Sequence, residues 1–111
     1  MTNKQMVAKI RRFLLKQGKQ AYQEGCMYLT EDGLKCAVGC LLKKKAYTPE
    51  LEGNTIGDNI VLQALRDSGL SPLTKKRKDI LSQCQIIHDD YYKHHGEWED
   101  YINEEFDKIE L

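Results

Sequence analysis

Hydrophobic residues at the start of the chain recur at three- and four-residue steps, which is typical of an amphipathic helix. Thr2 and Gln5 have the spacing of a capping box, so the helix is expected to begin after Thr2. Gly25 is the expected stop, and Gly18 is the weakest position before it. The apolar positions are Met6, Val7, Ile10, Phe13, Leu14, Ala21 and Tyr22.

The next segment predicts a small β-hairpin followed by a short helix. Asp32-Gly33 is a turn dipeptide, and the flanking residues 26–30 and 34–36 read as its two arms. From Cys36 to Leu42 the residues are small and then bulky, with a single glycine at Gly39. Small residues on one helix face allow another backbone to approach closely, so we expect a short buried helix here.

Three further periodic segments complete the pattern. A helix is expected from near Thr55 to Ser68-Gly69, and another follows a cap at Thr74 or Ser71. The last helix is expected to begin near Trp98, with apolar residues at helical spacing and acids on the opposite face. The pattern therefore predicts an α+β fold that is mostly α, with about five helical segments and one small β-hairpin, in a single domain over residues 1–111.

The charges are distributed unevenly although the chain is neutral overall. Residues 1–45 carry ten Lys and Arg against three Asp and Glu, whereas residues 89–111 carry two Lys against nine acids. The two ends are expected to pack together and neutralise each other, unless one of them meets a partner of opposite charge.

The hydropathy of the chain and its N-terminal residues indicate the cellular compartment, and the compartment in turn decides which chemistry the cysteines can have. No apolar run approaches the roughly 20 residues that a membrane span needs, and the N-terminus has no signal-peptide pattern. These features predict a cytoplasmic protein, and the reducing cytosol favours free thiols or a metal site over disulfides for the four cysteines.

Two cysteine hypotheses stay open. Cys36 with Cys40, and Cys84 with His88, are i, i+4 pairs that could together hold zinc, with Cys26 as a substitute ligand. The structural alternative is that these cysteines are small core residues and that no cofactor is bound.

The second hypothesis is a thiol-dependent hydrolase. Cys36 would be the nucleophile at a helix start, His88 the base and Asp89 the group that orients it. Any chain with cysteine and histidine can suggest such a set, so an enzyme is disfavoured against a binding protein.

Two surfaces are candidates for binding. The first is the basic run Lys75, Lys76, Arg77 and Lys78, which stands at a helix start where the helix dipole prefers acids. Either this run or Lys43–Lys45 could meet the phosphates of a small anionic, nucleotide-like ligand, although no glycine-rich phosphate loop is present. Direct nucleic-acid binding is disfavoured because the domain is neutral and its tail acidic.

The second surface combines aromatic and acidic residues near the C-terminus. Aromatic side chains are enriched at protein interfaces, although a role of Tyr91 and Trp98 in closing the core is favoured over this one. The segment includes His94-His95, and the candidate binding residues are Tyr91, Tyr92, Trp98, Glu99 and Asp100.

Three motifs together resemble a family. The segment Lys35–Leu42, the run Tyr47-Thr48-Pro49-Glu50-Leu51-Glu52-Gly53 and the later Gln85–Asp89 look like a group of small uncharacterised bacteriophage and prophage proteins. The resemblance covers roughly residues 20–100, with matches at Cys36, Gly39 and His88-Asp89, and it brings no catalytic residues with it.

The resemblance implies a context rather than a reaction. It implies an accessory protein in the cytoplasm of an infected or lysogenic bacterial host, which binds and inhibits a host protein or complex. Components of antiviral defence are the expected target class, in the manner of anti-CRISPR or similar counter-defence proteins. The target and the oligomeric state stay open.

Overall fold

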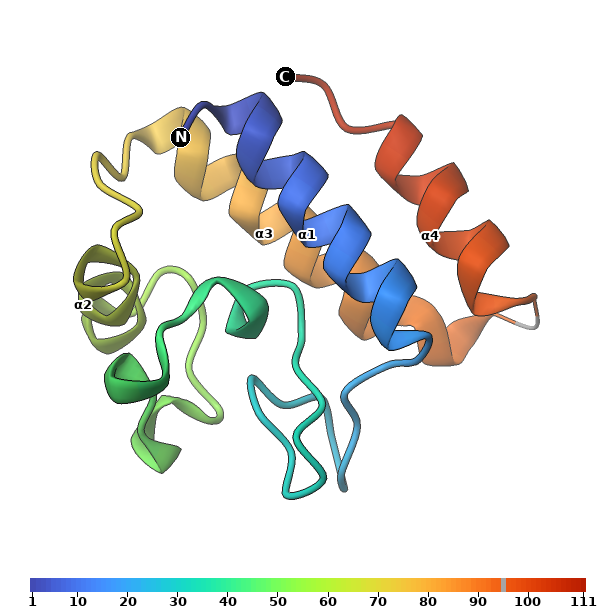
Figure 1. The fold of residues 1–111 in the computed structure, drawn as a ribbon, viewed down its shortest axis with the longest axis horizontal. Coiled ribbons are helices and arrows are strands. Elements are labelled where there is room, and N and C mark those ends of the chain that lie inside the picture. Colours follow the sequence, from blue (N-terminus) through green and yellow to red (C-terminus); the bar gives the residue numbers. More distant parts are fainter. Residues whose placement is uncertain (95) are drawn as a thin grey trace.

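The computed structural model describes residues 1–94 and 96–111, and His95 lies outside the described residues. Four α-helices are present in this part: α1 (Asn3–Gln17), α2 (Asn59–Asp67), α3 (Lys75–Asp89) and α4 (Trp98–Asp107). Short 3₁₀ turns lie at Gly39–Leu41, Lys44–Ala46, Pro49–Leu51 and Asp90–Lys93. Figure 1 shows α1, α3 and α4 side by side, with the loops between α1 and α2 and helix α2 beyond them.

The core lies between α1, α3 and α4, each of which contacts the other two. Burial follows the helical periodicity of the sequence, since each helix turns its apolar stripe inward. Trp98 closes one end of this core, and its indole N–H donates to the Leu14 carbonyl at 2.8 Å. Fully buried side chains in these helices include Met6, Ile10, Leu14, Ile80, Leu81 and Ile102.

The basic front and the acidic tail do pack together. Arg11 of α1 forms an ion pair with Asp107 of α4 at 2.8 Å, and its guanidinium also donates to Asn103. The expected mutual neutralisation is therefore present at the contact between α1 and α4, although only part of the acidic tail takes part in it.

The prediction of a β-hairpin, and with it the α+β class, is wrong. Among residues 1–94 and 96–111 there is no β-strand, and the two arms meet only at an isolated bridge between Leu29 and Lys35. A second isolated bridge joins Tyr22 and Cys26. The chain is all-helical apart from its loops and turns.

The hairpin fails to extend because side chains take the backbone groups that a ladder would need. The N–H groups of Tyr28 and Leu29 both donate to the Glu52 carboxylate, at 2.9 and 3.2 Å. On the other arm, Gln17 accepts the Lys35 N–H at 2.9 Å and donates to the Lys35 carbonyl at 2.8 Å. These partners lie far from the two arms in the sequence, so the local pattern of the arms cannot reveal them. The sequence therefore predicts strands that the described part of the chain does not contain.

The expected helix from Cys36 to Leu42 is a single turn. Cys40 N–H donates to the Cys36 carbonyl, and the next two bonds tighten to the i+3 spacing of the Gly39–Leu41 turn. The turn at Gly39 packs closely against the backbone of Tyr28, as its small residues predict. Only glycine fits there, because a Cβ at this position would lie 2.0 Å from the Tyr28 carbonyl oxygen.

Two of the helix caps agree with the sequence prediction, and two of the helix ends differ from it. The capping box of Thr2 and Gln5 is confirmed, as is the Thr74 cap of α3. Helix α1, however, ends at Gln17 rather than near Gly25, because Gly18 takes a left-handed conformation with φ of 78°. Helix α2 begins at Asn59 rather than near Thr55, because the Asp58 carboxylate folds back onto the Thr55 N–H at 2.7 Å.

No helix in the described residues combines the length and apolar character needed to cross a membrane.

Candidate functional site

His88 lies near the C-terminal end of α3 and is completely buried. The Ala21 N–H donates to its Nε2 at 2.9 Å, and its Nδ1 lies 2.8 Å from Asp89 Oδ1. Because Nε2 accepts a hydrogen bond, the ring proton must sit on Nδ1, which donates to the carboxylate. His88 is therefore a neutral ring that ties the loop after α1 to the end of α3.

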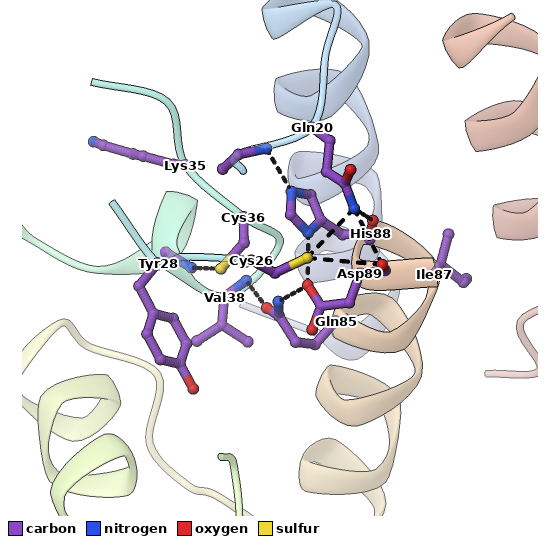
Figure 2. Close-up of polar contacts among 12 residues, drawn as sticks. Gln20, Cys26, Tyr28, Lys35, Cys36, Val38, Gln85, Ile87, His88 and Asp89 are labelled. Carbon is purple, nitrogen blue, oxygen red and sulfur yellow. Dashed lines mark hydrogen bonds and ion pairs between the residues drawn. The ribbon is translucent and has the colours of Figure 1, made fainter. Parts of the chain in front are cut away.

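Cys26 completes a small polar cluster with His88 and Asp89, which we call the Cys26 cluster (Figure 2). Its thiol points to the Asp89 carbonyl at 3.7 Å, and the Gln20 amide donates to the carbonyls of His88 and Asp89. Sulfur, ring nitrogen and carboxylate oxygen lie within 4.8 Å of one another. In the described part of the chain, no other three His, Cys, Asp or Glu side chains gather in this way.

The hydrogen bonds of the Cys26 cluster do not suit a metal ion. A metal at His88 Nδ1 would have to displace the proton that the Ala21 N–H fixes there, leaving an imidazolate. Burial, with Asp89 nearby, also raises the pKa of the Cys26 thiol to about 12, so the thiolate that zinc requires is disfavoured.

The zinc ligands expected from sequence are not brought together. Within residues 1–94 and 96–111, no three of Cys36, Cys40, Cys84 and His88 come within 4.8 Å of one another. The Cys40 thiol instead donates to the Ala37 carbonyl at 3.0 Å, and Cys84 is a buried core residue. Burial raises the pKa of both thiols to about 12. Cys26, which had been only a substitute ligand, is the cysteine that reaches His88.

Cys36 lacks the surroundings of a nucleophile. It is fully buried, its sulfur accepts the Gly39 N–H at 3.3 Å, and burial raises its pKa well above the ordinary value. It precedes a 3₁₀ turn rather than an α-helix, so no helix dipole lowers that pKa. Both nitrogens of His88 are engaged elsewhere, so the geometry offers no thiolate–imidazole pair.

Gln85 connects the Cys26 cluster to the turn after Cys36. Its side-chain oxygen accepts the Val38 N–H at 3.0 Å, and its amide donates to Asp89 Oδ1 at 2.8 Å (Figure 2). Sequence reasoning missed the roles of Gln85 and Gln20. The signals for Gln85 were its place at the start of the Gln85–Asp89 motif and its i, i+4 spacing with Asp89, whereas Gln20 gave none.

A pocket of about 380 Å³ lies beside the cluster, between Tyr28, Ile56, Ile86 and Asp89. Its walls are largely apolar, and the Asp89 carboxylate, held by His88 and Gln85, is the charged group in its lining. Such a pocket can hold an apolar group that carries a hydrogen-bond donor. It contains no activated nucleophile in the described structure.

The structure divides the predicted basic run. Arg77 is buried and donates to Asn3 Oδ1 at 2.8 Å, to the Leu70 carbonyl at 3.0 Å and to the Met1 carbonyl. It therefore joins the two chain segments that precede α1 and α3. Lys75 and Lys76 are exposed and Lys78 is half-buried, so these three keep their charge at the surface.

The aromatic and acidic candidates are divided in the same way. Trp98 is buried, and Tyr91 packs edge-on against it with ring centroids 4.8 Å apart. Tyr92 is 65% exposed. Glu99 and Asp100 lie on the exposed side of α4. The aromatic pair thus serves the core, and the other three residues remain available to a partner.

Comparison of the chain with protein-family models, with curated proteins and with solved structures finds no match.

Proposed function

We propose that this protein is a non-enzymatic binding protein, which inhibits a host macromolecule by docking the exposed face of α4 on a basic surface. The observation that carries this proposal is the acidic character of that face. Glu99, Asp100 and Glu104 are exposed, and none of them has an ion-pair partner among residues 1–94 and 96–111.

The charge is concentrated because the helix separates acids from apolar residues. Trp98, Tyr101, Ile102 and Phe106 face the core, so the acids fall together on the opposite side. Asp107 is paired with Arg11 and Glu105 with Lys108, which leaves Glu99, Asp100 and Glu104 uncompensated. A basic partner would be attracted to these acids and held in register by them.

Tyr92 supplies an exposed aromatic anchor in the segment that leads into α4. Its neighbour Tyr91 packs on Trp98 at the start of α4, which places the segment at the same end of the helix. An exposed tyrosine offers a large contact area at small entropic cost, and such residues dominate many interfaces. The resemblance to phage accessory proteins supports a host target, with an antiviral defence complex as the target class.

The test is recovery of tagged protein from host lysate, followed by native mass spectrometry. We expect a stoichiometric host partner that is lost in the variant Glu99→Lys/Asp100→Lys and released as salt rises. Glu31→Lys/Asp32→Lys is the matched control, since both acids are exposed on a distant turn and the change in charge is the same. Equal loss of the partner in both variants would refute a role specific to α4.

A further inference from the structure

A second pocket, of about 410 Å³, lies next to the one beside Asp89, and Tyr28 contributes to both. Its charged side chains are Lys35, Lys43 and Lys44, which we call the lysine pocket. Figure 2 shows the Lys35 side chain extending away from the Cys26 cluster. The two pockets therefore differ in charge, with a carboxylate in one and ammonium groups in the other.

The positive charge of the lysine pocket is not neutralised from within. In the described part of the chain none of its three lysines forms an ion pair. The carboxylate of Glu52, which accepts hydrogen bonds from the Tyr28 and Leu29 N–H groups and the Tyr47 hydroxyl, is close by but does not line the pocket or pair with its lysines. An incoming anion would therefore supply the missing counter-charge.

The remaining lining favours a ligand with a flat apolar part. Tyr47 is half-buried at the wall of the pocket, and its ring is fixed by the 2.8 Å hydrogen bond to Glu52. Leu29 and Leu42 add apolar surface. Aromatic side chains beside lysines are the combination by which proteins hold a base next to its phosphate. The volume falls in the range of small-molecule sites, roughly 300–1,000 Å³.

The backbone around the lysines is held in place before any ligand arrives. The Lys43 N–H donates to the Ser68 hydroxyl at 2.8 Å, and the Lys44–Ala46 turn contacts α2. The pocket near Lys75 and Lys78 differs, because it is smaller, at about 260 Å³, contains Asp79 and has no aromatic side chain in its lining. Of the two lysine-bearing pockets, only the first combines charge with an aromatic wall.

We infer that the lysine pocket binds a small phosphorylated molecule with a planar ring, of the size and chemistry of a nucleotide. The phosphate lies against Lys35, Lys43 and Lys44, and the ring lies against Tyr47. This site is separate from the acidic face of α4, so the protein has a small-ligand site in addition to its protein-binding surface.

Isothermal titration of the 111-residue chain with adenosine monophosphate, adenosine and inorganic phosphate tests this inference. We expect adenosine monophosphate to bind at least about tenfold more tightly than either fragment, because only it engages both walls. Lys43→Glu/Lys44→Glu should weaken that binding at least about tenfold, since both lysines are exposed and neither forms an ion pair in the described residues. Tyr47→Leu should weaken binding of adenosine monophosphate and leave binding of inorganic phosphate unchanged.

Lys75→Glu/Lys76→Glu is the matched control, because it reverses two exposed charges outside the lysine pocket. It should leave the dissociation constant within about twofold, apart from a general effect of net charge. The inference is overturned if adenosine monophosphate shows no heat of binding at millimolar concentration. It is equally overturned if inorganic phosphate binds as tightly as the nucleotide, or if the control weakens binding as much as the lysine-pocket variant.

Discussion

Gly39→Ala is the substitution whose outcome the structure fixes best. The added Cβ would lie 2.0 Å from the carbonyl oxygen and 2.9 Å from the carbonyl carbon of Tyr28, both of which are main-chain atoms. Real carbon–oxygen contacts are more than 1 Å longer, so the backbone at Tyr28 must move. Glycine is required here by packing rather than by its backbone angles, because Gly39 is absent from the positive-φ glycines.

The cost of this movement follows from what Tyr28 holds. Overpacking of a buried position costs about 1–3 kcal/mol. A shift of Tyr28 also strains the bond from its N–H to Glu52, and bonds to charged groups are worth about 1.5–3 kcal/mol. The loss of chain entropy in the unfolded state gives back only about 0.4–1 kcal/mol. We therefore expect a net loss of about 3 kcal/mol, or roughly 10–20 °C in Tm.

Urea unfolding followed by fluorescence measures this effect, because Trp98 is the only tryptophan and is buried in the native state. Gly57→Ala is the control. Its Cβ would meet only the Thr55 hydroxyl at 3.7 Å, an ordinary contact, so its stability should stay within about 0.5 kcal/mol of the parent. If Gly39→Ala were as stable as Gly57→Ala, the close approach of the Gly39 turn to Tyr28 would be wrong.

Three further substitutions or conditions test the same structure by denaturation. Glu52→Gln should cost about 1.5–3 kcal/mol, because one carboxylate oxygen becomes an NH₂ that faces donors, and an effect below 0.5 kcal/mol would contradict the hydrogen bonds to Tyr28 and Leu29. Arg77→Lys should lower the free energy of unfolding by about 1–3 kcal/mol although the charge is kept, because one ammonium cannot reach Asn3, Leu70 and Met1 together. The control Lys76→Arg, at an exposed position, should leave the free energy of unfolding unchanged. Raising the pH above 9 should lower the unfolding midpoint, because the pKa values of Cys26, Cys40 and Cys84 rise from 9.0 to about 12 on folding and the unfolded chain loses these protons first; a midpoint that is flat from pH 8 to 10.5 would count against burial of the thiols.

The sequence predicted those parts of the fold that depend on local periodicity. Helices α3 and α4, the Thr2 capping box and the Thr74 cap could all be predicted, because each depends on residues within a few positions of one another. The β-hairpin could not be judged in this way. Whether its arms pair depends on Glu52 and Gln17, which lie far from them in sequence and take their backbone groups.

The same limit applied to the candidate sites. Spacing of i, i+4 suggested that Cys36 and Cys40 would face Cys84 and His88, but spacing says nothing about which helix faces meet. The ring of His88 instead accepts the Ala21 N–H, and Cys26 from a loop occupies the neighbouring position. Residue type assigns Arg77 to a basic surface, whereas its guanidinium donates to the Leu70 carbonyl. For Trp98 the sequence left a surface role and a core role open, and the indole donates to the Leu14 carbonyl in the core.

These corrections bear on function as well as on fold. Chemistry alone would choose the histidine, the cysteines and the arginine first. His88 and Arg77 are engaged in hydrogen bonds to other segments of the chain, and the Cys40 thiol is bound within its own turn. Among the charged groups without an ion pair in the described residues are Glu99, Asp100 and Glu104 of α4 and the three lysines of the lysine pocket. The buried thiols keep their protons, since burial raises their pKa, so the proposals made for this protein rest on its charged surface groups rather than on a thiolate.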